Sequence, residues 1–241
     1  MSEKESGLSL VRRLFLTRVG LGAGVIGASV VGAKVAAASV PAASPAANAA
    51  ADASGSWKPA RHEQDAWYDQ IPGQHRFLID TDNGEAISWG MRFAGNYFNA
   101  NQATYGLKDS DLAVIIVARH RSTSFAYNNA MWAKYGKYFS AQAEFVDPKT
   151  KEAPTVNVYL TAEEGQTAPI DQMVKKGVHF AVCGMSTRAI AGRAAEGTGG
   201  KPDEIVKELS ANLVGNARIV PAGILAVSRA QEYGYTLATV V

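Results

Sequence analysis

The sequence is poor in the residues that build disulfides and metal sites. Its 241 residues include one cysteine and four histidines, with no C-x-x-C or H-x-x-x-H spacing. One cysteine cannot form an intramolecular disulfide, and the histidine spacing does not suggest a metal cluster. A G-x-S-x-G elbow is also absent, which argues against a serine hydrolase. We therefore expect no metal and no bound cofactor.

The chain also lacks a basic run or patch of the kind that binds nucleic acid. Its formal net charge is +2; five basic and two acidic residues give +3 to residues 1–38, which leaves −1 for the rest. With 47% hydrophobic and 19% charged residues, the chain can bury a core. These numbers predict a near-neutral globular protein with a basic N-terminal segment and no nucleic-acid partner.

Residues 1–38 have the pattern of an export signal. Arg12 and Arg13 are adjacent, and an uncharged stretch rich in Gly and Ala follows at residues 19–33. This resembles a twin-arginine (Tat) signal, with a general secretory signal or an uncleaved anchor as the alternatives. The stretch is shorter than the roughly 20 residues that span a bilayer, so we expect no permanent membrane anchor. We predict export to the periplasm or an equivalent compartment, with the Tat translocase as a partner during export.

Residues 39–60 are rich in Ala, Ser and Pro and are interpreted as a flexible tail, and residues 61–241 have the pattern of one domain. Short apolar runs predict five strands, at residues 75–81, 111–120, 179–184, 217–223 and 235–241. Apolar residues at three- and four-residue spacing predict helices at residues 85–105, 125–139, 169–176, 186–196, 203–213 and 224–233. This alternation predicts a single α/β domain with a mainly parallel five-stranded sheet flanked by helices, layered as in Rossmann and flavodoxin folds.

Two local features of this domain are less regular. Ser122, Thr123 and Ser124 precede the predicted helix at 125–139, and we expect one of them to cap it. Residues 156–160 are a candidate for a further short strand.

The carboxyl ends of the predicted strands define the expected ligand edge of the sheet. Cys183 ends one strand directly before a predicted helix, whose free N–H groups and dipole would stabilise a thiolate. Arg188, one helical turn further, would add positive charge. His120 ends another strand and would act as an acid, a base or an anion-binding partner of Cys183.

Each of these residues has an alternative interpretation. A free cysteine is often a small buried apolar residue, and His120 would equally suit a capping or solvent-facing position. Asp80, Asp82 and Glu85 follow the first predicted strand, where turn formation and helix capping account for them, with a functional role as the alternative.

Three segments resemble the DsrE/DsrF-like sulfur-relay superfamily, in particular its exported members: "RHRSTSFAYNNAMWAKYG", "VHFAVCGMSTRA" and "NARIVPAGILAVSRAQEYGYTLATV". The resemblance extends from about Arg76 to Val241. It implies an α/β fold with a mainly parallel sheet and a homotrimeric or homohexameric assembly. It also implies that a cysteine after a central strand, here Cys183, carries a persulfide between a donor and an acceptor protein.

The sequence therefore favours an exported protein that binds or relays sulfur on Cys183 as a persulfide or mixed disulfide. If active, it would be a sulfurtransferase-like carrier, with Arg188 and His120 supporting the thiolate. The alternative is a non-catalytic oligomeric binding module for a small anion, a metal or a haem-like ligand at the same edge. A weaker alternative is a structural subunit of an envelope complex. Reactivity of the thiol distinguishes these interpretations. A carrier needs a reactive thiol, whereas a cysteine that only fills the core resists alkylation in the folded protein.

Overall fold

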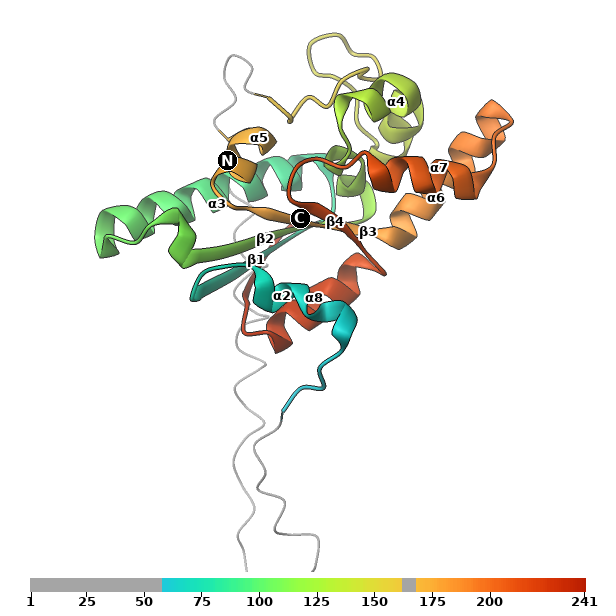
Figure 1. Cartoon of the computed structure of the whole chain (residues 1–241). Helices are drawn as coiled ribbons and strands as arrows, with labels where there is room; N and C mark the ends of the chain where they lie inside the picture. The colour runs from blue at the N-terminus through green and yellow to red at the C-terminus, as the bar shows by residue number, and fades with distance from the viewer. Residues whose placement is uncertain (1–57, 162–167) are drawn as a thin grey trace, which may run out of the picture. The chain divides into compact units, whose positions relative to one another are not determined.

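The computed structural model describes residues 58–161 and 168–241, which belong to one compact unit, Trp57–Val241. One sheet has the strand order β4-β3-β2-β1-β5, and every neighbouring pair is parallel (Figure 1). The strands are β1 (His75–Thr81), β2 (Leu112–Ala118), β3 (His179–Cys183), β4 (Ala217–Val220) and β5 (Thr236–Val240). The predicted α/β class and five-stranded sheet are confirmed.

The predicted signal at residues 1–38 and residues 39–57 of the predicted tail lie outside the described residues. In the part of the chain that the structure describes, no helix has both the length and the apolar character needed to cross a bilayer.

Helices cover the two faces of the sheet unequally (Figure 1). The larger helical layer consists of α3 (Gly84–Tyr105), α4 (Asn129–Ala143), α5 (Ile170–Lys175), α6 (Gly184–Thr198) and α7 (Pro202–Ala211). The smaller helical layer consists of α2 (Trp67–Gln70) and α8 (Gly223–Glu232). Short 3-10 turns are η2 (Glu63–Asp65), η3 (Asp109–Asp111) and η4 (His120–Ala126).

The alternation of side chains along the strands feeds both cores. In β3, Phe180 and Val182 belong to the core under the larger layer, whereas Ala181 belongs to the core under the smaller one. Strand β2 is buried along its whole length. A strand in the middle of a parallel sheet has both faces covered, which explains its continuous apolar sequence.

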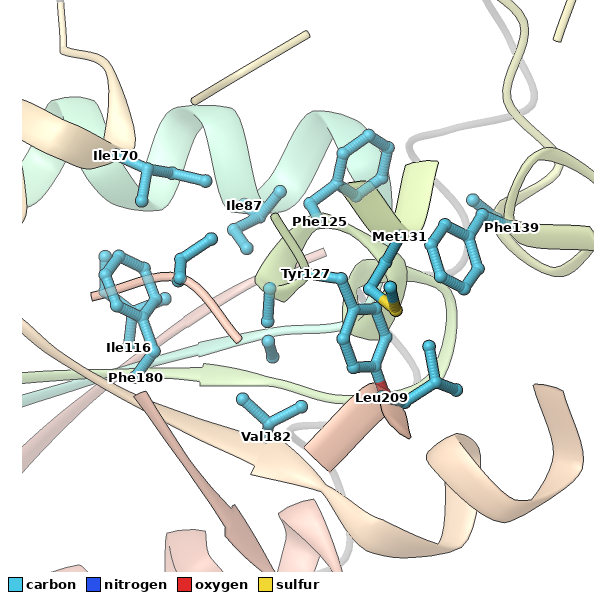
Figure 2. Close-up of a cluster of buried hydrophobic side chains, with 14 of the residues drawn as sticks. Ile87, Ile116, Phe125, Tyr127, Met131, Phe139, Ile170, Phe180, Val182 and Leu209 are labelled. Carbon is cyan, nitrogen blue, oxygen red and sulfur yellow. The ribbon is translucent and has the colours of Figure 1, made fainter. Parts of the chain in front are cut away.

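The core under the larger layer packs aromatic rings among aliphatic side chains (Figure 2). The Trp132 ring lies 5.4 Å from the ring of Phe125 and 5.1 Å from that of Phe139, which also stacks on Tyr127 at 5.1 Å. These side chains are fully buried. Aromatic burial of this kind is the main source of stability that a helical layer can supply.

The core under the smaller layer combines stacked aromatic rings, such as Trp67 and Tyr68 at 3.9 Å, with directed polar contacts. Tyr68 of α2 donates to the carbonyl oxygen of Ala226 at 3.1 Å, and Tyr235 donates to the carbonyl oxygen of Tyr68 at 2.9 Å. Arg76 Nη1 donates to the carbonyl oxygen of Tyr233 at 3.1 Å and to Asp69 Oδ1 at 3.0 Å. The segment before β1 is thereby fixed across α8 and β5.

The prediction of a helix starting near residue 125 was wrong at its N-terminus. Residues 120–126 form η4, and α4 begins at Asn129, with Asn128 Oδ1 accepting from the Met131 N–H at 3.2 Å. The hydroxyls of Ser122, Thr123 and Ser124 bond instead to carbonyl groups elsewhere, such as Thr81 O at 2.9 Å from Ser122 Oγ. Because these three hydroxyls are bonded to other carbonyl groups, the cap of α4 comes from Asn128.

The candidate strand at residues 156–160 was also wrong, because this stretch forms a turn. The Asn157 side-chain amide donates to the carbonyl oxygens of Phe125 at 2.7 Å and Tyr127 at 2.8 Å. Its Oδ1 accepts from the Tyr159 N–H at 3.1 Å. The buried Asn157 side chain thus supplies the hydrogen bonds that these two carbonyl groups need. The segment is held by this side chain as a turn and does not join the sheet as a strand.

Candidate functional site

Cys183 is the last residue of β3 and the N-cap of α6, with 6% of its surface exposed. Its sulfur lies near the Ser186 hydroxyl and the backbone N–H groups of Ser186, Gly223 and Met185, which favour its charged form. Met185 and Ser186 belong to α6 and Gly223 begins α8, so both helix N-termini point at one sulfur. N–H groups in the first turn of a helix lack intrahelical acceptors and stabilise an anion there.

These contacts change the acidity of the thiol. Burial by itself raises the pKa of Cys183, because it disfavours the charged form. The donor groups of Ser186, Gly223 and Met185 oppose burial and outweigh it, so the pKa lies below the ordinary value for a thiol. The thiolate, which is the nucleophilic form of cysteine, is therefore more accessible in the folded protein than in a free cysteine.

A buried hydroxyl pair fixes the backbone at Cys183 from the opposite side. Thr187 Oγ1 donates to the Cys183 carbonyl oxygen at 2.9 Å and lies 2.7 Å from the Tyr127 hydroxyl. Because the threonine proton is used on Cys183, the tyrosine is the donor of the second bond. Burial raises the pKa of Tyr127, which keeps that proton in place.

Two glycines allow the chain to pass close to the thiol. A Cβ at Gly184 would lie 2.8 Å from the Val220 carbonyl oxygen, and a Cβ at Gly223 would lie 2.4 Å from Arg119 Cβ. A residue larger than glycine at either position would force the neighbouring atoms to move. The loop after β4 can therefore reach the sulfur with the Gly223 N–H.

Arg119, directly after β2, provides a positive charge near the sulfur. Its Nε and Nη2 donate to Oδ1 and Oδ2 of the buried Asp80 of β1 at 2.7 and 2.9 Å. This hydrogen-bonded pairing raises the pKa of Arg119; burial opposes the effect, and the negative charges of Asp80, Asp82 and Cys183 add to it. Sequence reasoning missed this pair, although both residues lie at ends of neighbouring predicted strands.

The structure places the predicted supporting residues at the same edge of the sheet as Cys183. Arg188 is exposed on α6, and none of the interactions described for the thiol involves it. His120 is exposed at the start of η4 with a φ of 54°. A positive φ is uncommon for histidine and is found often at functional sites. The support of the thiolate by Arg188 and His120 stays a prediction.

The acidic residues at the end of β1 and in the turn after it have structural partners. Asp80 pairs with Arg119, the Asp82 carbonyl oxygen accepts from the Arg121 N–H at 2.8 Å, and Glu85 Oε1 accepts from Trp89 Nε1 at 3.3 Å. Within residues 58–161 and 168–241, no three His, Cys, Asp or Glu side chains are grouped to hold a metal ion.

Two large apolar side chains are exposed beside the thiol. Met185 is 65% exposed and Ile224 is 64% exposed, and each lies one residue after the first residue of a helix that points at Cys183. The sulfur is therefore nearly covered, within an apolar rim that is open to solvent.

No family model and no curated protein matches this chain. Among solved structures, the chain is similar to the protein of unknown function MTH1491 from Methanobacterium thermoautotrophicum. The two share 13% sequence identity over 69% of this chain and 99% of that chain, with a TM-score of 0.36. A likeness at this level carries no argument about function.

Proposed function

We propose that this protein is an exported, DsrE-like sulfur carrier that holds sulfane sulfur on Cys183. The observation that carries the proposal is that the N-termini of α6 and α8 lie beside one sulfur, where the Ser186 hydroxyl and the backbone N–H groups lower the thiol pKa. Structural cysteines in a core lack such donors, whereas reactive thiols lie in electropositive surroundings. Arg119 supplies the nearby permanent charge.

The chemistry is a transfer of neutral sulfur without net loss of electrons. The Cys183 thiolate attacks the outer sulfur of a persulfide donor, R–S–SH. A bond forms between the Cys183 sulfur and that outer sulfur, the donor S–S bond breaks, and its electron pair leaves on R–S⁻. An acceptor thiolate then attacks the outer sulfur on Cys183, which leaves again as the thiolate.

A small-anion binding module is the second candidate. The N–H groups of Met185, Ser186 and Gly223 and the charge of Arg119 would hold an anion as readily as a thiolate. In that case the sulfur would be one wall of the anion site and would not react.

Intact-mass analysis after polysulfide treatment separates the two candidates. For a carrier we expect a gain of about 32 Da, one sulfur atom, that thiol reductant removes and that Cys183→Ser lacks. If the thiol stays unmodified until the fold is denatured, the carrier proposal is lost and the binding module remains.

Export and assembly belong to the same proposal. The adjacent Arg12 and Arg13 support the Tat pathway and a periplasmic location. We expect the double change of these arginines to lysine to retain the protein in the cytoplasm, measured by fractionation of cells.

The exposed Met185 and Ile224 support burial against further copies in a homotrimer or hexamer. Light scattering of the mature protein tests this assembly.

A further inference from the structure

Strand β4 is one edge of the sheet, and part of its backbone points away from β3. The Asn216 carbonyl oxygen accepts from the Phe180 N–H at 3.0 Å, and Phe180 pairs with Ala217 in a parallel register. In a parallel ladder this arrangement turns the peptide groups of Ala217 and Ile219 outward. Within the described residues these outward groups have no hydrogen-bond partner.

Two cavities lie along this edge under the smaller helical layer. One, of about 330 Å³, is lined in part by Tyr68, Pro221 and Leu225. The other, of about 380 Å³, is lined in part by Ile71, His179 and Asn216. Trp67 and Arg218 line both, so the two cavities lie on either side of one arginine.

Arg218 carries the uncompensated charge of this groove. Its guanidinium lies over the Trp67 ring, 4.7 Å from the centroid, and it has no ion pair within the described residues. Arg229, in contrast, pairs with Glu232 at 2.8 Å and with Asp65 at 3.6 Å. Burial and the charge of Arg218 lower the pKa of His179, which is therefore neutral near pH 7. A stacked guanidinium with free edges suits a carboxylate, which it can bind by two parallel hydrogen bonds.

The spacing of these features fits an added strand. Side chains on one face of a strand recur every second residue, roughly 7 Å apart. If an extended segment paired with β4, one of its side chains would lie opposite Arg218 on the face of the smaller layer. Its neighbours two residues away on each side would lie over the two cavities.

We propose that the free edge of β4 binds an extended acidic segment of another protein by strand addition. The outward peptide groups of Ala217 and Ile219 would supply the ladder, and a carboxylate would pair with Arg218. Apolar side chains two residues before and after the carboxylate would fill the cavities. Main-chain bonds give affinity in such complexes, and pockets for alternate side chains give specificity. This site is separate from the sulfur chemistry proposed for Cys183.

The test uses the full chain and a labelled peptide, Val-Thr-Glu-Thr-Val with blocked ends, in fluorescence anisotropy. We expect saturable binding that Arg218→Glu weakens at least tenfold. Changing the glutamate of the peptide to lysine should have the same effect. The matched control Lys207→Glu, an equal charge change on the larger layer, should stay within twofold of the unchanged protein.

The backbone part of the proposal has its own variants. Ile219→Pro removes an N–H that points away from β3, a position where an edge strand tolerates proline. We expect it to weaken binding at least tenfold, while Ile219→Ala, which keeps the N–H, stays within threefold. If Ile219→Pro fails to fold by circular dichroism, two peptides N-methylated at opposite sets of alternate amides replace it, and only one set should weaken binding.

Three results would overturn the proposal. The first is a peptide that shows no saturable binding, and the second is binding that neither Arg218→Glu nor the backbone variants change. The third is a dimer in light scattering that Ile219→Pro separates, since β4 would then pair with a second copy of this chain.

Discussion

The two helical layers hold the same sheet in different ways. The larger layer packs buried aromatic rings, with Trp132 and Phe139 at its centre. The smaller layer has a short helix and α8, fixed by hydroxyl and guanidinium bonds to carbonyl groups. Area-dependent burial is strong and non-directional, whereas hydrogen bonds are weaker and set geometry. The larger layer buries more apolar side chains, and in the smaller layer hydrogen bonds fix the segment before β1.

Removing a ring from the larger layer should have the largest effect. Trp132→Ala is expected to lower the free energy of unfolding by about 3–5 kcal/mol, because it leaves a cavity and breaks the bond from Nε1 to the Ser124 carbonyl oxygen. Denaturant titration measures this loss. Trp89→Ala on the exposed side of α3 is the control, expected within about 0.5 kcal/mol. Equal losses at the two positions would contradict the account of the larger layer.

Removing one hydroxyl from the smaller layer should cost less. Tyr68→Phe deletes the bond to the Ala226 carbonyl oxygen, with an expected loss of about 1 kcal/mol. Denaturant titration again gives the value, and Tyr105→Phe, on an exposed ring, is the control. A loss as large as that of Trp132→Ala would mean that the two layers are held alike.

The thiol, which both layers contact, should link stability to pH. Since the folded pKa of Cys183 is lowered, the thiolate stabilises the fold fully above the ordinary thiol pKa of 9.0. This contribution is lost as the pH falls through the lowered value. The stability difference between the unchanged protein and Cys183→Ser should therefore grow with pH in that window. A pH-independent difference in free energy of unfolding would contradict a lowered pKa.

The smallest change, Ser186→Ala, should alter acidity with little effect on the fold. It removes the hydroxyl that helps to lower the pKa of Cys183 and leaves the N–H groups, so the thiol pKa should rise. The pH dependence of alkylation by iodoacetamide reports this shift. Ser210→Ala, on the exposed side of α7, should leave the alkylation profile unchanged. If both variants behave alike, the Ser186 hydroxyl does not act on the sulfur.

The strands could be predicted from the sequence because each is a short apolar run. The position of Cys183 at the end of a strand before a helix followed from the same runs. What the sequence left out is strand order: Gly223 reaches the sulfur because β4 lies beside β3, and Arg119 meets Asp80 because β2 lies beside β1. Helix α2 was missed because four residues are too few to show a helical period.

One sulfur atom lies beside donor groups of α6, in the larger layer, and of α8, in the smaller one. Any change in its charge, by protonation, alkylation or the addition of a second sulfur, alters the attachment of both helices at once. By thermodynamic linkage, the packing of those helices acts back on the sulfur with the same free energy. A change at the sulfur would therefore act first on Met185 and Ile224, the second residues of these two helices.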